Sequence, residues 1–277
     1  MEHILTQEHI SAYCIELEER EKAPATLQKY RYALREFVAS VAGEPVTKSR
    51  VLVYKRMLSQ RYAASTVNGR LAAVNGLLDF LGWHDCKVHP LRVQRMEYRD
   101  TRRELTREEY ARLLQAAPRR SRLYLMLQTI CATGIRVSEL QYITVESLGV
   151  GHTEVRNKGK CRVILLPTKL CSKLKQYCRR CGLSAGSVFV TRSGLPIDRS
   201  NIWQMMKRLA EKAGVDKRKV YPHNLRHLFA RTFYGVEHDL DHLAAILGHS
   251  SINTTRIYTR TGMSACRGQI ERMHLIL

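Results

Sequence analysis

The stretch "VGHTEVRNKGKCRVILLP", residues 150–167, decides the fold class, because the apolar pattern here changes from helical spacing to alternation. Asn157-Lys158-Gly159-Lys160 stands in its middle and is typical of a tight turn between two strands. Helical patterns lie on both sides. The stretch therefore predicts a small antiparallel β-sheet inside a domain that is otherwise mostly helical.

The helices around this hairpin carry their own signals. Thr106, followed three residues later by Glu109, is a capping box that opens a helix, and helices are expected to continue to about Glu146. After the hairpin, helical spacing returns in four segments, and a fifth short helix is expected near the C-terminus: 168–181, 199–213, 223–234, 239–247 and 263–276. We assign residues 104–277 to one domain.

Residues 1–84 carry four amphipathic helical patterns joined by short connections. Thr6, Thr26 and Thr66 stand where three of these patterns begin, and we expect them to be N-caps. Residues 85–103 lose this periodicity and hold scattered charge, which is typical of an extended linker. The predicted fold is mainly α (α+β): an N-terminal four-helix domain, a linker, and a mostly helical domain with a small antiparallel sheet.

The charge of the chain points to a polyanion. It holds 46 Lys and Arg against 25 Asp and Glu, a formal net charge of +21, and residues 101–277 carry 31 of the basic and 13 of the acidic side chains. Nucleic acid is the commonest partner of a protein this basic, and the alternative is a solvated basic surface that keeps the protein in solution. No membrane-spanning run or signal-peptide pattern is present, so we expect a cytoplasmic, nucleoid-associated protein.

Eight cysteines in a chain without an export signal favour reduced thiols over a disulfide framework. Cys178 and Cys181 form one Cys-x-x-Cys pair, with Cys171 seven residues earlier. A zinc site would need further ligands, and no second such pair exists. The segment also has the pattern of a helix that ends at Gly182, which is the interpretation that we prefer.

Two stretches place arginine where it could bind a phosphate. In "ATGIRVSEL", Gly134 breaks one helix and Arg136 opens the next, and Glu139 could brace its guanidinium. In "YPHNLRHLFA", His223 and Arg226 lie three residues apart and project from one side of a helical turn. Each stretch alone could equally be an ordinary basic surface.

A third stretch, "LGHSSINTTRIYTR", sets His249 and Tyr258 nine residues apart. A phenol with a pKa near 10 is a poor nucleophile at neutral pH. It becomes useful where cations stabilise the charge on a phosphate and a neighbour accepts the phenol proton. The arginines and histidines of the other two stretches could do this.

In this order, "TGIRVSEL", "HNLRHLFA" and "LGHSSINTTRIYT" resemble the Arg, His-x-x-Arg and His…Tyr boxes of the tyrosine recombinases, the phage integrase family. "NKGKCRVILLP" resembles the strand-turn-strand that carries the family's lysine, and "TLQKYRYALREF" resembles its helical core-DNA-binding domain. Larger integrases have an arm-binding domain before these parts. This chain begins almost at the first helix of the core-binding domain, so we expect a short Xer-like or transposon-type layout.

The resemblance implies a role for each matching residue. Tyr258 matches the nucleophile that attacks a DNA phosphodiester and forms a 3′-phosphotyrosyl link. Arg136 and Arg226 match the arginines that clamp the non-bridging oxygens. His249 matches the histidine that binds the scissile phosphate, and His223 matches a histidine with a proton-transfer or positioning role. We expect Tyr258 to act in cis, with the arginines of its own protomer.

Three further assignments are less direct. Lys158 matches the lysine that protonates the departing 5′-oxygen, and Lys160 is its rival because this turn is shorter than the common pattern. Glu139 matches a supporting acidic position. His227 recurs in the family box and is expected to be structural.

The resemblance also implies partners. These are double-stranded DNA with inverted-repeat core sites and further copies of the chain, a tetramer in the synapse and a monomer or dimer when free, with strand exchange through a Holliday junction. It implies no cofactor and no metal in the reaction. The C-terminal tail is expected to dock on a neighbouring protomer, or else to cap its own domain.

Two other functions remain open from the sequence. One is a related strand transferase, a type IB topoisomerase-like enzyme or a telomere resolvase, which would share the chemistry. The other is a DNA-binding protein with an inactive site, although every catalytic position of the family is filled here. The DNA target, and the choice among integration, excision and dimer resolution, cannot be read from the sequence.

Overall fold

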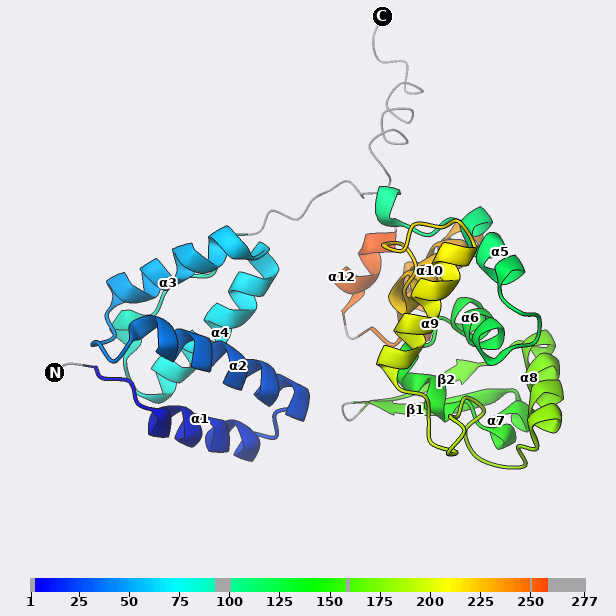
Figure 1. The fold of residues 1–277 in the computed structure, drawn as a ribbon, viewed down its shortest axis with the longest axis horizontal. Coiled ribbons are helices and arrows are strands. Elements are labelled where there is room, and N and C mark those ends of the chain that lie inside the picture. The colour runs from blue at the N-terminus through cyan, green and yellow to red at the C-terminus, as the bar shows by residue number, and fades with distance from the viewer. Residues whose placement is uncertain (1–2, 93–100, 158–159, 250, 259–277) are drawn as a thin grey trace, which may run out of the picture. The chain divides into compact units, whose positions relative to one another are not determined.

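A computed structural model describes residues 3–92, 101–157, 160–249 and 251–258 (Figure 1). The chain divides into two compact units, Met1–Arg95 and Met96–Leu277. Within the described residues, no helix has the length and apolar character needed to cross a membrane. The prediction of a mainly helical fold with one small antiparallel sheet is confirmed.

The first unit contains the four expected helices, α1 Gln7–Glu19, α2 Pro24–Val41, α3 Lys48–Arg61 and α4 Ala64–Phe80. Thr6 caps α1 as predicted, since its side chain accepts from the backbone N–H of His9. The predictions for Thr26 and Thr66 were wrong. Both residues lie inside their helices, because the turns start at Ala23 and Ala63 without a side-chain cap.

The first unit ends later than the sequence suggested. Residues 84–86 form a short 3₁₀ helix, η1 His84–Cys86, and Cys86 and Val88 are buried in the core. The side-chain amides of Asn68 and Asn75 on α4 bond the backbones of Leu91 and Val88 in both directions, at 2.7–3.2 Å. These amides take the place of a strand partner. Residues 85–91 therefore pack against α4 and are not part of a free linker.

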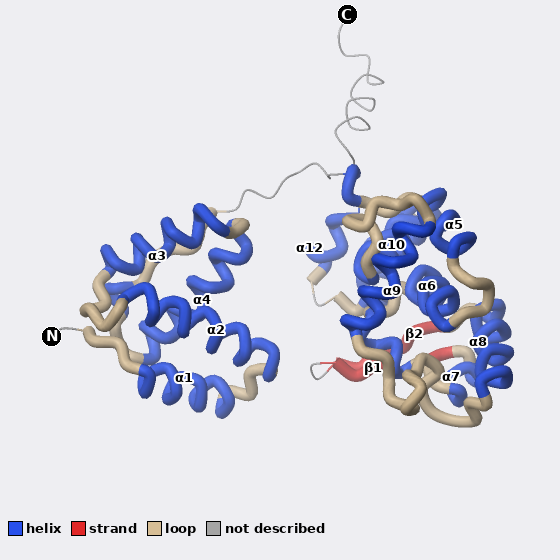
Figure 2. The backbone as a smooth tube through the Cα atoms, viewed as in Figure 1, coloured by secondary structure: helices blue, strands red, loops and turns tan. Residues whose placement is uncertain are grey.

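The second unit is built from helices around a single hairpin, as Figure 2 shows. Its elements in chain order are η2 Thr101–Arg103, α5 Arg107–Ala116, α6 Arg122–Thr133, η3 Val137–Tyr142, α7 Val145–Val150, β1 His152–Asn157, β2 Lys160–Leu165, α8 Thr168–Cys181, α9 Arg199–Lys212, α10 Pro222–Glu237, α11 Leu240–Leu247, α12 Ile252–Thr255 and η4 Arg256–Tyr258. The strands pair antiparallel with Asn157 opposite Lys160, which confirms the predicted hairpin, while residues 158 and 159 between them lie outside the described residues. The predicted helix at 263–276 lies outside the described residues.

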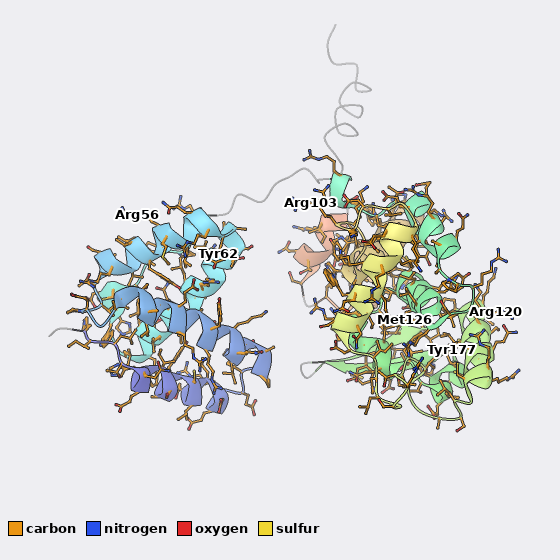
Figure 3. The ribbon with its side chains drawn as sticks, viewed as in Figure 1. Arg56, Tyr62, Arg103, Arg120, Met126 and Tyr177 are labelled. Atoms are coloured by element: carbon orange, nitrogen blue, oxygen red, sulfur yellow. The ribbon has the colours of Figure 1, made fainter. Side chains whose placement is uncertain are left out.

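Helix α6 is the centre of the second unit and packs against α8, α9 and α10. Leu125, Met126, Leu127 and Ile130 are buried in it, and Met126 is seen among the helices in Figure 3. Each buried side chain of this size contributes about 1.5–3 kcal/mol of transfer free energy. The core fixes α6 and α10 together: α6 leads into the segment that holds Arg136, and α10 carries His223, Arg226 and His227.

Candidate active site

Tyr258 lies in η4 at the end of the described chain, and its side chain is buried rather than presented to solvent. Its ring meets the edge of His227 at a centroid distance of 5.0 Å and is stacked on His249 at 6.3 Å. Ser251 caps the short helix α12 that leads to it, so the backbone between His249 and Tyr258 turns back toward α10. The two residues that the sequence set nine positions apart are neighbours in space.

Arg226 is a buried cation at this place, with 2% of its surface exposed. It projects from the first turns of α10, and its guanidinium donates to the carbonyls of Gly134 and Leu247, both at 2.6 Å. Its positive charge also acts on the nearby Tyr258 phenol and lowers the pKa of that group against the effect of burial. Burial, together with the charges of Arg136 and Arg162, lowers the pKa of Arg226 to about 10, so the group stays cationic at neutral pH.

His249 stands between Arg226 and a buried threonine. Its Nε2 lies 3.1 Å from a guanidinium nitrogen of Arg226, and its Nδ1 lies 2.8 Å from Oγ1 of Thr255. An arginine can only donate, so Nε2 accepts and the ring proton is assigned to Nδ1. Burial and the charges of the nearby arginines lower the pKa of His249 to about 4. The imidazole is therefore neutral at pH 7.

Arg136 is fixed by a carboxylate, as the sequence predicted. Glu139 accepts from the backbone N–H and the guanidinium of Arg136, each at 2.9 Å. The guanidinium also donates to the carbonyl of Gly248 at 3.1 Å, and its side chain is one-third exposed. Burial would raise the pKa of Glu139, but these hydrogen bonds and the charge of Arg162 hold it below its ordinary value. Arg136 opens a 3₁₀ helix, η3, and not the α-helix that the sequence suggested.

Arg162 belongs to the same network, although the sequence gave no reason to select it. From β2 it donates to Oε2 of Glu139 and, at 2.6 Å, to the carbonyl of Ile246. Its side chain is only 13% exposed. The neighbours Val163 and Leu165 are exposed instead. On this strand the arginine therefore faces inward, and these two apolar side chains face solvent. A signal was available in the alternation, because Arg162 shares a face with the buried Ile164.

His223 lines a cavity of about 340 Å³ together with Arg136 and Arg226. Arg199 and Trp203 of α9 form part of its wall. The ring of His223 is exposed by surface area and meets His227 at a centroid distance of 4.4 Å. The surrounding protein, followed by the charges of Arg226 and Arg136, lowers the pKa of His223, which favours its neutral form. The cavity is open to a ligand that carries negative charge.

The structure leaves the lysine undecided. Lys158 lies outside the described residues. Lys160 begins β2, but only its backbone is described. All the other predicted site residues come together on the second unit: Arg136, Glu139, His223, Arg226, His227, His249 and Tyr258.

Comparison with known proteins identifies this arrangement. The sequence model described as the phage integrase family matches residues 103–264, which span the whole site. The chain belongs to the phage integrase family. "Tyrosine recombinase XerC" of Roseiflexus sp. (strain RS-1) is 32% identical over 87% of this chain and 85% of its own length. "Tyrosine recombinase XerA" of Pyrococcus furiosus is 28% identical over 99% of this chain and 97% of its own length. The chain is a tyrosine recombinase, as its boxes predicted.

Solved structures agree on the fold of this integrase-family chain. A crystal structure of XerA recombinase covers 99% of it at 26% identity, with a TM-score of 0.53 and 100% of that chain covered. A XerH recombinase bound to a palindromic difH substrate in a post-cleavage complex gives a TM-score of 0.72 at 19% identity, covering 97% of this chain and 89% of that one. A lambda integrase tetramer bound to a Holliday junction gives 0.75 at 16% identity, covering 92% and 77%.

Proposed function

We propose that this recombinase cleaves DNA at a specific site with Tyr258 as its nucleophile and rejoins it to a second strand through a Holliday junction. The observation that carries the proposal is the stacking of the Tyr258 ring on His249, whose Nε2 lies 3.1 Å from the Arg226 guanidinium, so that the charge of Arg226 acts on the phenol. A nucleophile beside a buried fixed cation is what attack on a phosphodiester needs, because negative charge grows on the phosphate as the bond forms.

The first step follows from the charges in the site. The Tyr258 oxygen bonds to phosphorus while the bond from phosphorus to the 5′-oxygen breaks, leaving a 3′-phosphotyrosyl link and a free 5′-hydroxyl. Arg136 and Arg226 bind the non-bridging oxygens, and both guanidinium groups are fixed by carbonyls or by Glu139 before DNA arrives. Fixed donors need no reorganisation during the reaction, which is the main source of such electrostatic stabilisation.

The proton of Tyr258 needs an acceptor. Burial raises the pKa of Tyr258, and the charge of Arg226 offsets this only in part, so the phenol is protonated at neutral pH. His223 and His249 both have lowered pKa values and are neutral, hence able to accept a proton. We assign the transfer to His223, because the Nε2 lone pair of His249 already accepts from Arg226. Lys158, or its rival Lys160, would supply the proton to the 5′-oxygen.

Cleavage in cis is the arrangement that the contacts favour. Within one chain the Tyr258 ring is stacked on His249, and His249 is bonded to Arg226 on one side and to Thr255 on the other. The rejoining step reverses the first one with the 5′-hydroxyl of another strand. The phosphotyrosyl bond retains the free energy of the phosphodiester, so no ATP is required.

The DNA and the assembly are part of the proposal. We propose double-stranded DNA with inverted-repeat core sites, with the helical first unit as core-binding domain and a tetramer as the synaptic form. The lambda integrase tetramer on a Holliday junction and the XerH complex with difH support this, because they share the fold. The tail at 259–277, expected to dock on a neighbour, lies outside the described residues. Because the proposed substrate is DNA, we also propose that the protein acts in the cytoplasm with the nucleoid.

A suicide substrate tests the nucleophile. On a nicked site the 5′-hydroxyl fragment diffuses away after cleavage, so the covalent adduct accumulates and can be counted on a denaturing gel. Wild type should form it and Tyr258→Phe should not. Tyr234→Phe is the matched control, since Tyr234 on α10 also packs against a histidine ring but lies outside the network. An undiminished adduct in Tyr258→Phe would remove Tyr258 from this role.

Assays of the wild-type protein distinguish the other candidate functions. Relaxation of any supercoiled plasmid without paired sites would favour a topoisomerase-like enzyme, and hairpin products at one palindromic site would favour a telomere resolvase. A wild-type protein that binds its site and forms no adduct would be a DNA-binding protein only.

A further inference from the structure

Three groups that bind metals meet in the first unit, where the N-terminal segment touches η1. His3, Asp85 and Cys86 each offer one ligand atom, and these atoms all lie within 4.8 Å of one another. Nε2 of His3 is 3.7 Å from Oδ1 of Asp85, and Oδ2 of Asp85 is 3.7 Å from Sγ of Cys86. The Cys171, Cys178 and Cys181 set raised by the sequence shows no such convergence within the described residues.

The main chain and a tryptophan hold this cluster together. The backbone N–H of Val46 donates to the carbonyl of His3 at 2.7 Å, and the thiol of Cys86 donates to the carbonyl of Val46 at 3.4 Å. The His3 ring is stacked on Trp83, with centroids 4.6 Å apart. Residues from three separate segments are thus held side by side.

The donor set selects one class of ion. An imidazole nitrogen, a thiolate and one carboxylate suit a borderline-soft divalent cation such as Zn²⁺, whereas Mg²⁺ and Ca²⁺ prefer oxygen ligands alone. Zinc at about 2.0–2.3 Å from each donor in a tetrahedron keeps the donors roughly 3.3–3.8 Å apart. The two separations of 3.7 Å, one to each oxygen of Asp85, fall in that range, and all three donors lie within 4.8 Å of one another, so a small side-chain adjustment brings them onto one ion. We propose that His3, Asp85 and Cys86 form a zinc-binding site with water as fourth ligand.

Access and charge fit such a site. The Asp85 side chain is 74% exposed and that of His3 is 27% exposed, so an ion can enter from solvent, whereas Cys86 is buried behind them. Binding exchanges the Cys86 thiol proton, released to solvent, for a Zn–S bond. Asp85 supplies the second negative charge, so the bound ion is neutralised.

The ion would act as a structural cross-link within the first unit. It would join residue 3 to residues 85 and 86 and so close a loop around all four helices of the first unit, α1 to α4. A cross-link over a loop of this length stabilises the fold mainly by restricting the unfolded chain. The role is structural, because the candidate residues for the reaction all belong to the second unit.

Cobalt binding to the whole protein tests the site. After chelator treatment and gel filtration, one equivalent of Co²⁺ should give a thiolate charge-transfer band in the near ultraviolet together with tetrahedral d–d bands, and Zn²⁺ should displace it. Zn²⁺ should also raise the unfolding temperature. His3→Gln should weaken binding by at least about tenfold, and Cys86→Ser should abolish the charge-transfer band.

Two other cysteine variants serve as controls. Cys14→Ser removes a second buried thiol of the same unit, and Cys181→Ser removes an exposed thiol of the second unit, and both should keep the full signal. His3→Gln changes a partly exposed side chain, so it reports on binding even where Cys86→Ser disturbs the fold. Unchanged affinity in His3→Gln, no cobalt band in wild type, or loss of the band in Cys181→Ser would overturn the proposal.

Discussion

A guanidinium nitrogen of Arg226 lies 3.1 Å from Nε2 of His249. Burial and this contact together keep the imidazole neutral, because a proton on Nε2 would be poorly solvated and would face a fixed cation at hydrogen-bond distance. Arg226 lies on α10, and His249 lies in the turn after α11. Arg226 also donates to the carbonyl of Leu247, the last residue of α11, next to Gly248.

The stability of the free protein should therefore fall as the pH drops from 7 to 5. The pKa of His249 is about 4 in the folded chain and near 6.5 in an unfolded one. Between these values only the unfolded chain takes up the proton, so acid favours unfolding there, and the effect is complete below pH 4. Thermal unfolding at pH 7 and pH 5 measures it.

The variant His249→Gln should lose less stability than wild type over this interval. His242→Gln is the control, because His242 is exposed on α11 and contacts Phe233 rather than the arginines. Equal acid sensitivity of wild type and His249→Gln would contradict the assigned contact.

Arg162 should position the site rather than touch DNA. Arg162→Met leaves Glu139 buried with Arg136 as its remaining partner, and a buried carboxylate that loses one of two cations costs roughly 1–3 kcal/mol. We expect the cleavage rate to fall by about tenfold or more with DNA affinity changed less than about threefold, since binding is spread over many basic contacts. Cleavage and binding are measured separately on one suicide substrate.

A double variant separates this positioning role from general damage. In Arg162→Met with Glu139→Gln no unpaired carboxylate remains, so the unfolding temperature should recover in part. Full additivity of the two losses would show that Arg162 and Glu139 do not act on each other.

Some elements of the second unit could be predicted from the sequence, and others could not. The hairpin, the cap at Thr106 and the helix 168–181 follow from local patterns, and the structure places them as expected. Arg162 was missed because hydropathy would place Val163 and Leu165 inside, and the structure exposes both. What turns Arg162 inward is Glu139 and the carbonyl of Ile246, which are 23 and 84 residues away along the chain.

The prediction of where the linker begins failed for the same reason. The predicted linker begins too early because Asn68 and Asn75 supply the hydrogen bonds that residues 88 and 91 need. Such long-range partners leave no periodic signal. Thr26 and Thr66 failed as caps for a different, local reason: each is the third residue of its helix, which starts at Pro24 or at Ala64 without a side-chain cap. The network around Arg226 was identified only through the resemblance of its boxes to a family.

Gly248 should be intolerant of any side chain. Its φ of +61° is a conformation that L-residues rarely adopt, and an added Cβ would lie 2.4 Å from Cδ of Arg162. Gly248→Ala should therefore lose about 1–2 kcal/mol from backbone strain and more from displacing Arg162. Gly182→Ala is the matched control, with a φ of +68° and nothing within 4 Å of the new Cβ. Chemical denaturation of both variants should give the larger loss for Gly248→Ala, and equal losses would mean that the Arg162 contact adds nothing.

Arg136 should be required for cleavage and dispensable for binding. Arg136→Ala removes a cation that is fixed before DNA arrives by Glu139 and Gly248, so the adduct should decrease by about a hundredfold or more, the size of effect seen when one preorganised donor is lost. DNA affinity should fall only slightly, because the net charge of +21 spreads phosphate contacts over many side chains. Adduct formation and electrophoretic mobility shift on the same site measure the two quantities.

Arg112→Ala, which removes an exposed arginine on α5 that bonds the carbonyl of Gly214, is the control and should change neither quantity by more than about twofold. A parallel collapse of binding and cleavage in Arg136→Ala would reassign this residue to DNA docking.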